Sequence, residues 1–346
     1  MYQHVDSGER LIDIRDLRVW YRTTRGPAKA VDGVNLTINR NEVFGLAGES
    51  GCGKSTLAKG ILGVIKLPGY FEGGEVDFCR KKSDSTLICE DLLKMSREQV
   101  RRMRWRDMAY IPQSAMNVLS PVARIDKQML DGIFEHTNWS KEKARARMYE
   151  CMDLVGLDKA VARMYPHELS GGMKQRVAIA AAITLTPDLI IADEPTTALD
   201  VNVQQVILQE LKEIREKLKL TLIYVTHDMA VHAEMADRMG IMYAGVLMEV
   251  APVVDTFHDP YHPYTEGLIS SIPSIGGGRE RMMGIPGRAP SPLEYPSGCR
   301  FHPRCPKVMA ICSEEMPTLK QVGPERYVAC HLHDEYTFEE RANGGD

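Results

Sequence analysis

The chain has 346 residues, 44% of them hydrophobic and 26% charged, and its formal net charge at pH 7 is −4. This length predicts about two domains, and the slight acidity argues against a protein that coats nucleic acid, which would need a basic face. No apolar run reaches the roughly 18 residues of a membrane span. Because Met1 to Asp16 lacks the apolar core of a signal peptide, we expect a cytosolic chain whose eight cysteines form no structural disulfides.

Residues 10–38 alternate apolar and polar positions, which predicts antiparallel strands with a turn at residues 25–27. Trp20 and Tyr21 lie at the end of the first of these strands. Spacing alone leaves two interpretations open for them: a pair of aromatic residues that cap the sheet, or a platform on which an adenine ring stacks.

A glycine-rich loop at 48–55 fits the pattern G-x-x-x-x-G-K-[ST], the phosphate-binding loop of nucleotide hydrolases and kinases. Its glycines let the backbone wrap around a polyphosphate, Lys54 can reach the β- and γ-phosphates, and the Ser55 hydroxyl can bind Mg²⁺. A predicted buried strand at 43–47 precedes the loop, and a predicted helix at 55–62 follows it with its N-terminus facing the anion. The residues that the loop would place at the nucleotide are Gly48, Ser50, Gly51, Cys52, Gly53, Lys54, Ser55 and Thr56.

The next segment alternates between helical and extended patterns. The basic run 97–106 is typical of a solvated helix face, and residues 108–113 form a short apolar strand that ends in Gln113. From about 114 to 168 the pattern is helical and rich in methionine. Met148 and Met152 fall at helical spacing, which favours a role in the core.

The sequence Leu-Ser-Gly-Gly-Met at 169–173 opens a helix with bare backbone N–H groups, which predicts a second anion site. The apolar run 189–194 is too short for a helix, and it ends in Asp193 and Glu194. A buried parallel strand would deliver both carboxylates to the edge of the sheet where α/β proteins bind ligands. Asp193 would then hold Mg²⁺, and Glu194 would act on the attacking water.

An amphipathic helix is predicted at 203–218 and another buried strand at 221–226. His227 follows this strand directly. A lone histidine is more often structural than catalytic, but its position beside two strands that already carry ligands favours a functional role.

Together these motifs resemble the ATP-binding cassette family. The resemblance implies an α/β fold: a P-loop RecA-like core with an antiparallel β flank and a helical insertion near 114–168. It also implies that Gln113 senses Mg²⁺ and water, that Glu194 is the general base and that His227 contacts the γ-phosphate. The motifs that carry the resemblance, in chain order, are Gly48–Ser55, Gln113, Leu169–Met173, Asp193–Glu194, Ala198–Asp200 and His227.

The same resemblance places Ser170, Gly171, Gly172 and Asp200 against the ATP that another subunit holds. One chain has one phosphate loop and one Leu-Ser-Gly-Gly signature, so each hydrolytic site would need a dimer. The resemblance also favours Tyr21 as the adenine platform.

Three segments are similar to a narrower group, the ATPases of oligopeptide and dipeptide permeases: Ser170–Arg176, Asp193–Val201 and His258–Thr265. This similarity implies a peripheral subunit on the cytoplasmic face of the membrane that drives uptake of peptides or a related solute. Its partners would be a second cassette ATPase, two permease subunits and, indirectly, an extracellular solute-binding protein. The competing class is a soluble cassette ATPase that acts on nucleic acid or ribosomes, but this chain has one cassette and no sustained heptads.

Composition shifts after about residue 255, because twelve of the 19 prolines lie between Pro252 and Pro324. We therefore expect a nucleotide-binding domain at 1–255 and a Pro-rich extension at 256–346. Four cysteines in this extension suit a [4Fe–4S] cluster or Zn²⁺, and His302 and His331 leave a zinc site of three cysteines and one histidine open. The segment 298–306 resembles the cluster-binding tail of the permease ATPases, which favours iron–sulfur. The cysteines concerned are Cys299, Cys305, Cys312 and Cys330, whereas Cys79, Cys89 and Cys151 are expected to be ordinary thiols.

Overall fold

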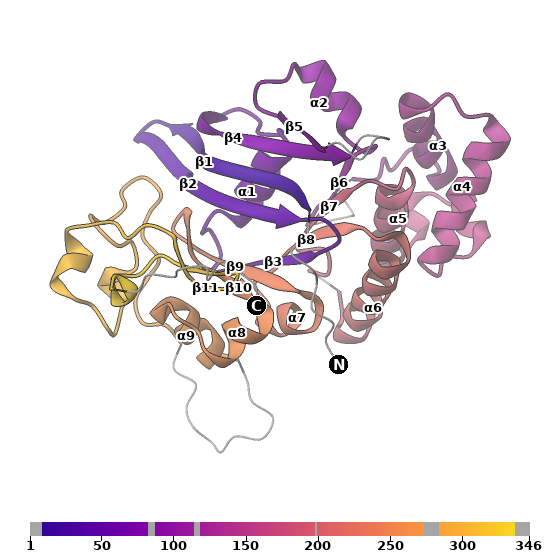
Figure 1. Ribbon diagram of the computed structural model, residues 1–346. Helices are drawn as coiled ribbons and strands as arrows, with labels where there is room; N and C mark the ends of the chain where they lie inside the picture. Colours follow the sequence, from indigo (N-terminus) through magenta and orange to yellow (C-terminus); the bar gives the residue numbers. More distant parts are fainter. Residues whose placement is uncertain (1–8, 82–86, 114–117, 198, 273–283, 336–346) are drawn as a thin grey trace, which may run out of the picture.

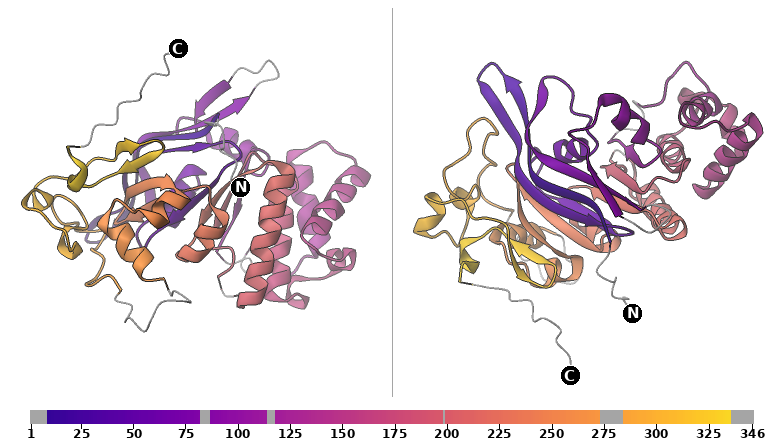
Figure 2. Two further views of the ribbon diagram at one scale, coloured as in Figure 1. Left: turned by 60° about the horizontal axis from the view of Figure 1, so that its bottom comes forward. Right: turned by 45° about the horizontal axis from the view of Figure 1, so that its top comes forward.

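The computed structural model of the chain describes residues 9–81, 87–113, 118–197, 199–272 and 284–335. Two β-sheets lie one above the other, with a group of helices at one side and the C-terminal segment at the opposite side (Figure 1). Both views in Figure 2 keep the C-terminal segment far from the helices α3 and α4. Ala198 and the first residues of the predicted helical insertion lie outside the described residues.

The smaller sheet is antiparallel, with the strand order β2-β1-β4-β5. The long pair formed by β1 and β2 confirms the strands predicted from the alternating pattern. The turn between them is at residues 24–25, slightly before the predicted 25–27. The bounds are β1 Arg10–Thr23, β2 Gly26–Asn39, β4 Gly69–Lys81 and β5 Leu87–Asp91.

The larger sheet has eight strands in the order β11-β12-β10-β9-β3-β8-β7-β6. The strands β6, β7, β8, β3 and β9 run parallel to their neighbours, and β10, β12 and β11 extend the sheet in antiparallel fashion. The bounds are β3 Val43–Ala47, β6 Met108–Ile111, β7 Leu189–Asp193, β8 Thr221–Val225, β9 Arg238–Tyr243, β10 Val246–Pro252, β11 Lys320–Gly323 and β12 Arg326–Val328.

The parallel strands are buried on both faces, so their side chains divide between two cores. Leu189 and Ile191 of β7 pack with the smaller sheet and α1, whereas Ile190 and Ala192 pack with the helices of the other face. This division follows from the two-residue period of a strand. It explains why the sequence shows continuous apolar runs here rather than alternation.

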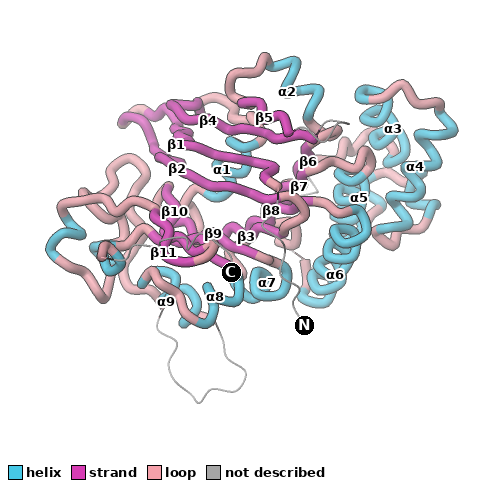
Figure 3. Tube along the Cα trace, in the orientation of Figure 1, coloured by secondary structure: helices cyan, strands magenta, loops and turns pink. Residues whose placement is uncertain are grey.

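Helix α1 lies between the two sheets, and helices α3 to α6 gather at one side (Figure 3). Met148 and Met152 are fully buried in the core of that helical group, which confirms the predicted role of the methionine stripe. The helix bounds are α1 Lys54–Ile61, α2 Arg97–Met103, α3 Ile125–His136, α4 Lys141–Leu154, α5 Gly171–Ile183, α6 Val201–Leu218, α7 Met229–Met235, α8 Val253–His258 and α9 Pro263–Ser270. Within the part of the chain that is described, no helix is long and apolar enough to cross a bilayer.

The described residues of the C-terminal extension form helix α9, the short strands β11 and β12, and turns between them. β12 pairs with β10, so the extension continues the larger sheet. The predicted domain boundary near residue 255 stays a prediction, since strand pairing crosses it.

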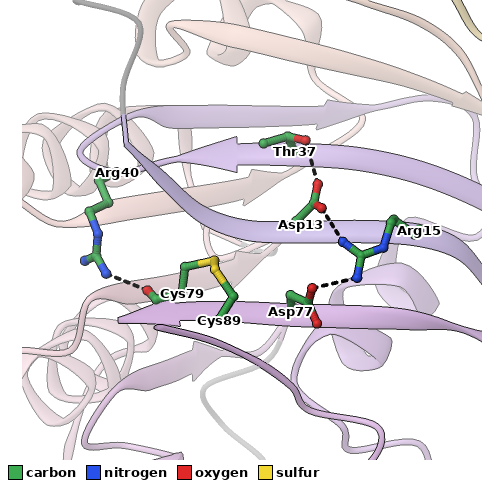
Figure 4. The surroundings of a disulfide bond; sticks show 7 residues. All are labelled: Asp13, Arg15, Thr37, Arg40, Asp77, Cys79 and Cys89. Atoms are coloured by element: carbon green, nitrogen blue, oxygen red, sulfur yellow. Dashed lines mark hydrogen bonds and ion pairs between the residues drawn. A yellow bond between two sulfur atoms is a disulfide. The ribbon is translucent and has the colours of Figure 1, made fainter. Parts of the chain in front are cut away.

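Two cysteines contradict the expectation that no structural disulfide forms. Cys79 of β4 and Cys89 of β5 are directly opposite each other in the antiparallel register, with Cα atoms 3.9 Å apart, and they form a disulfide (Figure 4). Nothing in the sequence alone sets the register of these two strands, so the pairing of the thiols could not be read from their spacing. The expectation of ordinary thiols was wrong for this pair, whereas Cys151 is a free, buried thiol.

Candidate functional site

The predicted site residues converge because the parallel strands end at one edge of the larger sheet. The phosphate loop follows β3, Asp193 ends β7, His227 comes two residues after β8, and Gln113 comes two residues after β6. Carboxyl ends of neighbouring parallel strands meet at the same edge, which is where α/β sheets bind ligands.

The loop itself requires glycine at the two points where it passes close to other backbone. Gly48 has φ 145°, and a Cβ there would lie 2.1 Å from the carbonyl oxygen of Met242. Gly53 has φ 111°, and its Cβ would lie 2.2 Å from the carbonyl oxygen of Ala30. Gly51 also has a positive φ, but the space around its Cβ position is open.

Lys54 is buried at the start of α1, and its ammonium group is held by the loop. Nζ donates hydrogen bonds to the carbonyl oxygens of Gly48 at 2.7 Å and Glu49 at 3.0 Å. Only 6% of the residue is exposed. A buried cation inside a ring of backbone groups gives the loop a positive centre suited to a polyphosphate.

Asp193 is 2% exposed and is oriented by two hydroxyl groups. Ser55 Oγ donates to its Oδ1 at 2.9 Å, and Tyr110 Oη donates to its Oδ2 at 2.8 Å. Burial and then the Asp193 charge raise the pKa of Tyr110, so this phenol stays protonated and remains a donor. Ser55 and Asp193 thus place two oxygen ligands side by side, the donor type that Mg²⁺ prefers.

Glu194 continues from Asp193 with a left-handed backbone, φ 47°, and its N–H donates to the carbonyl oxygen of Val225 at 2.8 Å. Three side chains surround its carboxylate. Gln113 Nε2 donates to Oε2 at 2.8 Å, Thr197 Oγ1 donates to Oε2 at 3.1 Å, and His227 Nδ1 lies 3.2 Å from Oε1. The structure therefore brings together the three residues predicted to be catalytic.

Tyr21 lies near the first turn of α1, where its hydroxyl is 3.4 Å from Thr56 Oγ1. This contact puts one edge of β1 beside the helix that carries the phosphate loop. Trp20, the neighbouring aromatic, donates from Nε1 to Asp32 of β2 at 3.1 Å, which is a structural contact.

The signature residues lie at the N-terminus of α5, and Asp200 lies at the N-terminus of α6. Ser170 Oγ caps α5 by accepting the Met173 N–H at 3.3 Å, and Asp200 Oδ1 caps α6 by accepting the Val203 N–H at 3.0 Å. The two helix starts touch, because a Cβ at Gly172 would meet Val203 at 2.8 Å. Ser170, Gly171 and Asp200 are exposed, and Gly172 is half-buried.

The four C-terminal cysteines are near one another, but they do not form a metal centre. All four are free thiols, and among the described residues no group of three or more Cys, His, Asp and Glu side chains is arranged to hold a metal ion. Burial raises the pKa of Cys330 to about 11, and the charges of the three other thiols add to this effect. The predicted iron–sulfur or zinc site is thus not supported by the arrangement of these side chains.

Sequence reasoning missed several residues that shape the site. Tyr110 and Thr197 each hold one of the two acidic side chains. Thr197 lies within the recognised segment Asp193–Val201, but neither residue was predicted to belong to the site. Tyr110 is in β6, three residues before Gln113, and its polar group on an otherwise apolar strand is the one available signal. Glu49 and its partners, described below, carry no such signal.

Comparison with known proteins agrees with this geometry. Residues 31–197 match the family model described as ABC transporter, and residues 248–312 match the model described as oligopeptide/dipeptide transporter, C-terminal region. A dimeric ATP-binding cassette, MJ0796, solved in a post-hydrolysis state with ADP and phosphate, superimposes with a TM-score of 0.61 at 26% identity; the match covers 70% of this chain and 99% of that one.

Two curated relatives cover almost the whole chain. The dipeptide transport ATP-binding protein DppD of Caldanaerobacter subterraneus is 42% identical over 327 residues, 94% of this chain and 98% of the relative. The oligopeptide transport ATP-binding protein OppD of Escherichia coli is 38% identical over 326 residues, 94% of each chain.

The fold and the site define an ATPase of the ATP-binding cassette class. Within that class, the chain belongs to the family of oligopeptide/dipeptide transporter ATP-binding proteins.

The two loop glycines give a test of the close approach at residue 48. Gly48→Ala should abolish binding of trinitrophenyl-ATP, measured by fluorescence titration, because its Cβ would overlap the Met242 carbonyl oxygen. Gly51→Ala is the matched control: its affinity should stay within about 30-fold of that of the unaltered chain, since left-handed strain alone costs about 1–2 kcal/mol and 1.4 kcal/mol corresponds to about tenfold. Equal losses in both variants would contradict the steric explanation.

Proposed function

We propose that this chain hydrolyses ATP to energise uptake of oligopeptides or dipeptides through membrane permease subunits. The observation that carries the proposal is the meeting of the phosphate loop, Asp193, Glu194 and His227 at one edge of the sheet. The match of residues 248–312 to the C-terminal region of peptide transporters supports the substrate class.

In the proposed site, the loop residues hold the phosphates and three side chains hold Mg²⁺. Lys54 and the loop N–H groups neutralise phosphate charge, and Tyr21 stacks on the adenine ring. Ser55, Asp193 and Gln113 are the Mg²⁺ residues; the 2.9 Å contact between Ser55 and Asp193 supports the first two. Mg²⁺ supplies charge neutralisation at the phosphates when it is bound.

Glu194 is the proposed general base. Its carboxylate would accept a proton from the attacking water while Gln113 and His227, both in contact with it, keep it oriented. His227 would also contact the γ-phosphate. Positioning and charge stabilisation therefore carry the reaction, as in other phosphoryl transfers to water.

A second cassette subunit completes each site in this proposal. The exposed helix starts at Ser170 to Gly172 and at Asp200 would face the ATP of the partner, which is either a paralogue or a second copy. The dimeric form of the cassette MJ0796 supports this arrangement. We place the dimer on the cytoplasmic face of the membrane, bound to two permease subunits that receive solute from an extracellular binding protein.

We propose, further, that residues 256–346 form an extension whose four cysteines bind a [4Fe–4S] cluster, with Zn²⁺ as the alternative. The four thiols are the donor type that such a cluster binds, and three of them lie close enough to Cys330 to raise its pKa. Cys299 and Cys312 are also held together by the backbone, because the N–H of Cys299 donates to the carbonyl oxygen of Cys312 at 2.8 Å. The side chains would have to turn toward one another on binding, since they form no metal group as they stand.

Glu194→Gln tests the role of the base. The amide keeps the shape but cannot accept the proton, so phosphate release should fall by about 10²–10⁴-fold while ATP binding persists. ATP should also shift this variant toward a dimer in gel filtration. Glu216→Gln, on the exposed face of α6, is the control, and near-normal turnover in Glu194→Gln would refute the assignment.

The transport assignment predicts the partners that a tagged chain retains from detergent-solubilised membranes. Mass spectrometry should identify two hydrophobic permeases, with or without a second cassette ATPase. If nucleic acid or ribosomes were recovered from the soluble fraction instead, the chain would belong to the alternative class of soluble cassette ATPases.

The cluster proposal predicts about four irons per chain in anaerobically purified protein, with a brown colour. Cys312→Ser should lose the iron, whereas Cys151→Ser, a change at a buried thiol of α4, should keep it. Stoichiometric zinc without iron would favour the alternative metal, and protein with neither metal would overturn the proposal.

A further inference from the structure

The C-terminal extension reaches the phosphate loop through one ion pair. Arg304 NH1 and NH2 donate to the two carboxylate oxygens of Glu49 at 2.7 Å and 2.8 Å, although the residues are 255 positions apart. Glu49 directly follows Gly48 in the loop. The Arg304 side chain is 6% exposed and that of Glu49 is 27% exposed, so the arginine is shielded from water and the carboxylate is partly accessible. A two-pronged contact of this kind fixes both distance and orientation.

The guanidinium of Arg304 is itself immobilised by groups from both parts of the chain. Nε donates to the carbonyl oxygen of Pro286 at 2.7 Å, NH2 to that of Ile285 at 3.2 Å, and NH1 to Tyr243 Oη at 3.2 Å. Every nitrogen of the group thus has a partner, and Tyr243 belongs to β9 of the central sheet. The planar guanidinium of Arg304 therefore links Glu49 to the extension in a fixed orientation, which the single ammonium group of a lysine could not do.

The main chain of Glu49 is held by the extension as well. Its N–H donates to Tyr264 Oη at 2.9 Å, and Tyr264, on α9, is fully buried among Tyr243 and Phe301. Glu49 is thus fixed twice, by its side chain and by its backbone. Both contacts come from residues beyond 255.

A second arginine of the same short segment holds the other side of the nucleotide site. Arg300 pairs with Asp32 of β2 and donates to the carbonyl oxygen of Ala244. Asp32 in turn accepts the Trp20 indole N–H, and Trp20 precedes Tyr21 in the chain. The extension therefore contacts both the phosphate loop and β2, the strand that pairs with β1 and so lies beside the proposed adenine platform.

We propose that Arg304, together with Tyr264, is a positioning residue that sets the conformation of the phosphate loop for ATP. The extension then acts as a built-in brace of the nucleotide site. This inference rests on the ATP site but not on the identity of the transported solute. The residues that touch the nucleotide remain those of the loop, and Arg304 acts through Glu49.

The test is a double-mutant cycle on the full chain, with trinitrophenyl-ATP affinity and steady-state hydrolysis as readouts. Arg304→Met should weaken binding about tenfold, in the range by which positioning residues modulate a distant site, and raise KM with little change in kcat. Glu49→Gln should weaken it by at least as much, because it leaves a buried cation unpaired. The double variant should be no worse than Arg304→Met alone, since the two residues act as a unit.

Arg326→Met is the matched control, because Arg326 is a half-buried arginine of the extension that pairs with Asp259 and stacks on Tyr261 at 3.6 Å. It should bind the analogue like the unaltered chain. If Arg304→Met fails to fold, Tyr264→Phe provides the test: loss of one hydroxyl frees the Glu49 N–H and should weaken binding severalfold. Affinities in Arg304→Met or Tyr264→Phe equal to that of Arg326→Met, additive losses in the cycle, or a fall in kcat at constant KM would overturn the proposal. Glu194→Gln, by contrast, tests hydrolysis and leaves this brace intact.

Discussion

The parallel register of β3, β8 and β7 is the constraint on which the site depends. Asp193 pairs with Val225 in the last position of the β7–β8 ladder, and the N–H of Glu194 adds one further hydrogen bond to the Val225 carbonyl oxygen. A shift of one residue in β7 would turn Asp193 from the face that carries Ser55 to the opposite one. The register is fixed by two hydrophobic cores, because the alternating side chains of β7 fill both.

This register places the adjacent carboxylates of Asp193 and Glu194 in different surroundings. Asp193, the last residue of the strand, is buried and receives two hydroxyl donors, so it suits a fixed ligand. Glu194 leaves the strand with a positive φ, which directs its side chain toward Gln113 and His227 rather than along the sheet. A left-handed non-glycine residue persists only where its surroundings impose it, and such strain is concentrated at functional sites. The backbone thus supplies the proposed Mg²⁺ ligand and the proposed general base from consecutive positions.

Most of this site could be predicted from the sequence, because each part is local: a glycine loop, or an acid or histidine directly after an apolar run. The strands at 43–47, 189–193 and 221–225 were recognised from the same local pattern. Contacts that depend on tertiary register could not be predicted. The disulfide of Cys79 and Cys89 needs the register of β4 and β5. The arrangement of the four C-terminal cysteines likewise could not be predicted, since cysteine spacing does not determine how side chains point. The pair formed by Glu49 and Arg304 joins residues with no shared motif.

The pair formed by Glu49 and Arg304 also helps to explain how the Pro-rich extension is held against the nucleotide-binding part of the chain. Its segment 299–305 has a single 3₁₀ turn, so its position is fixed mainly by side-chain contacts and not by backbone hydrogen bonds of a helix or sheet. Phe301 is buried against Tyr243 and Tyr264, and the two arginines on either side of it extend to Asp32 and Glu49. Each arginine is also adjacent to a cysteine: Arg300 follows Cys299, and Arg304 precedes Cys305. Cys299 and Cys305 therefore bracket the same short segment whose two arginines contact β2 and the phosphate loop.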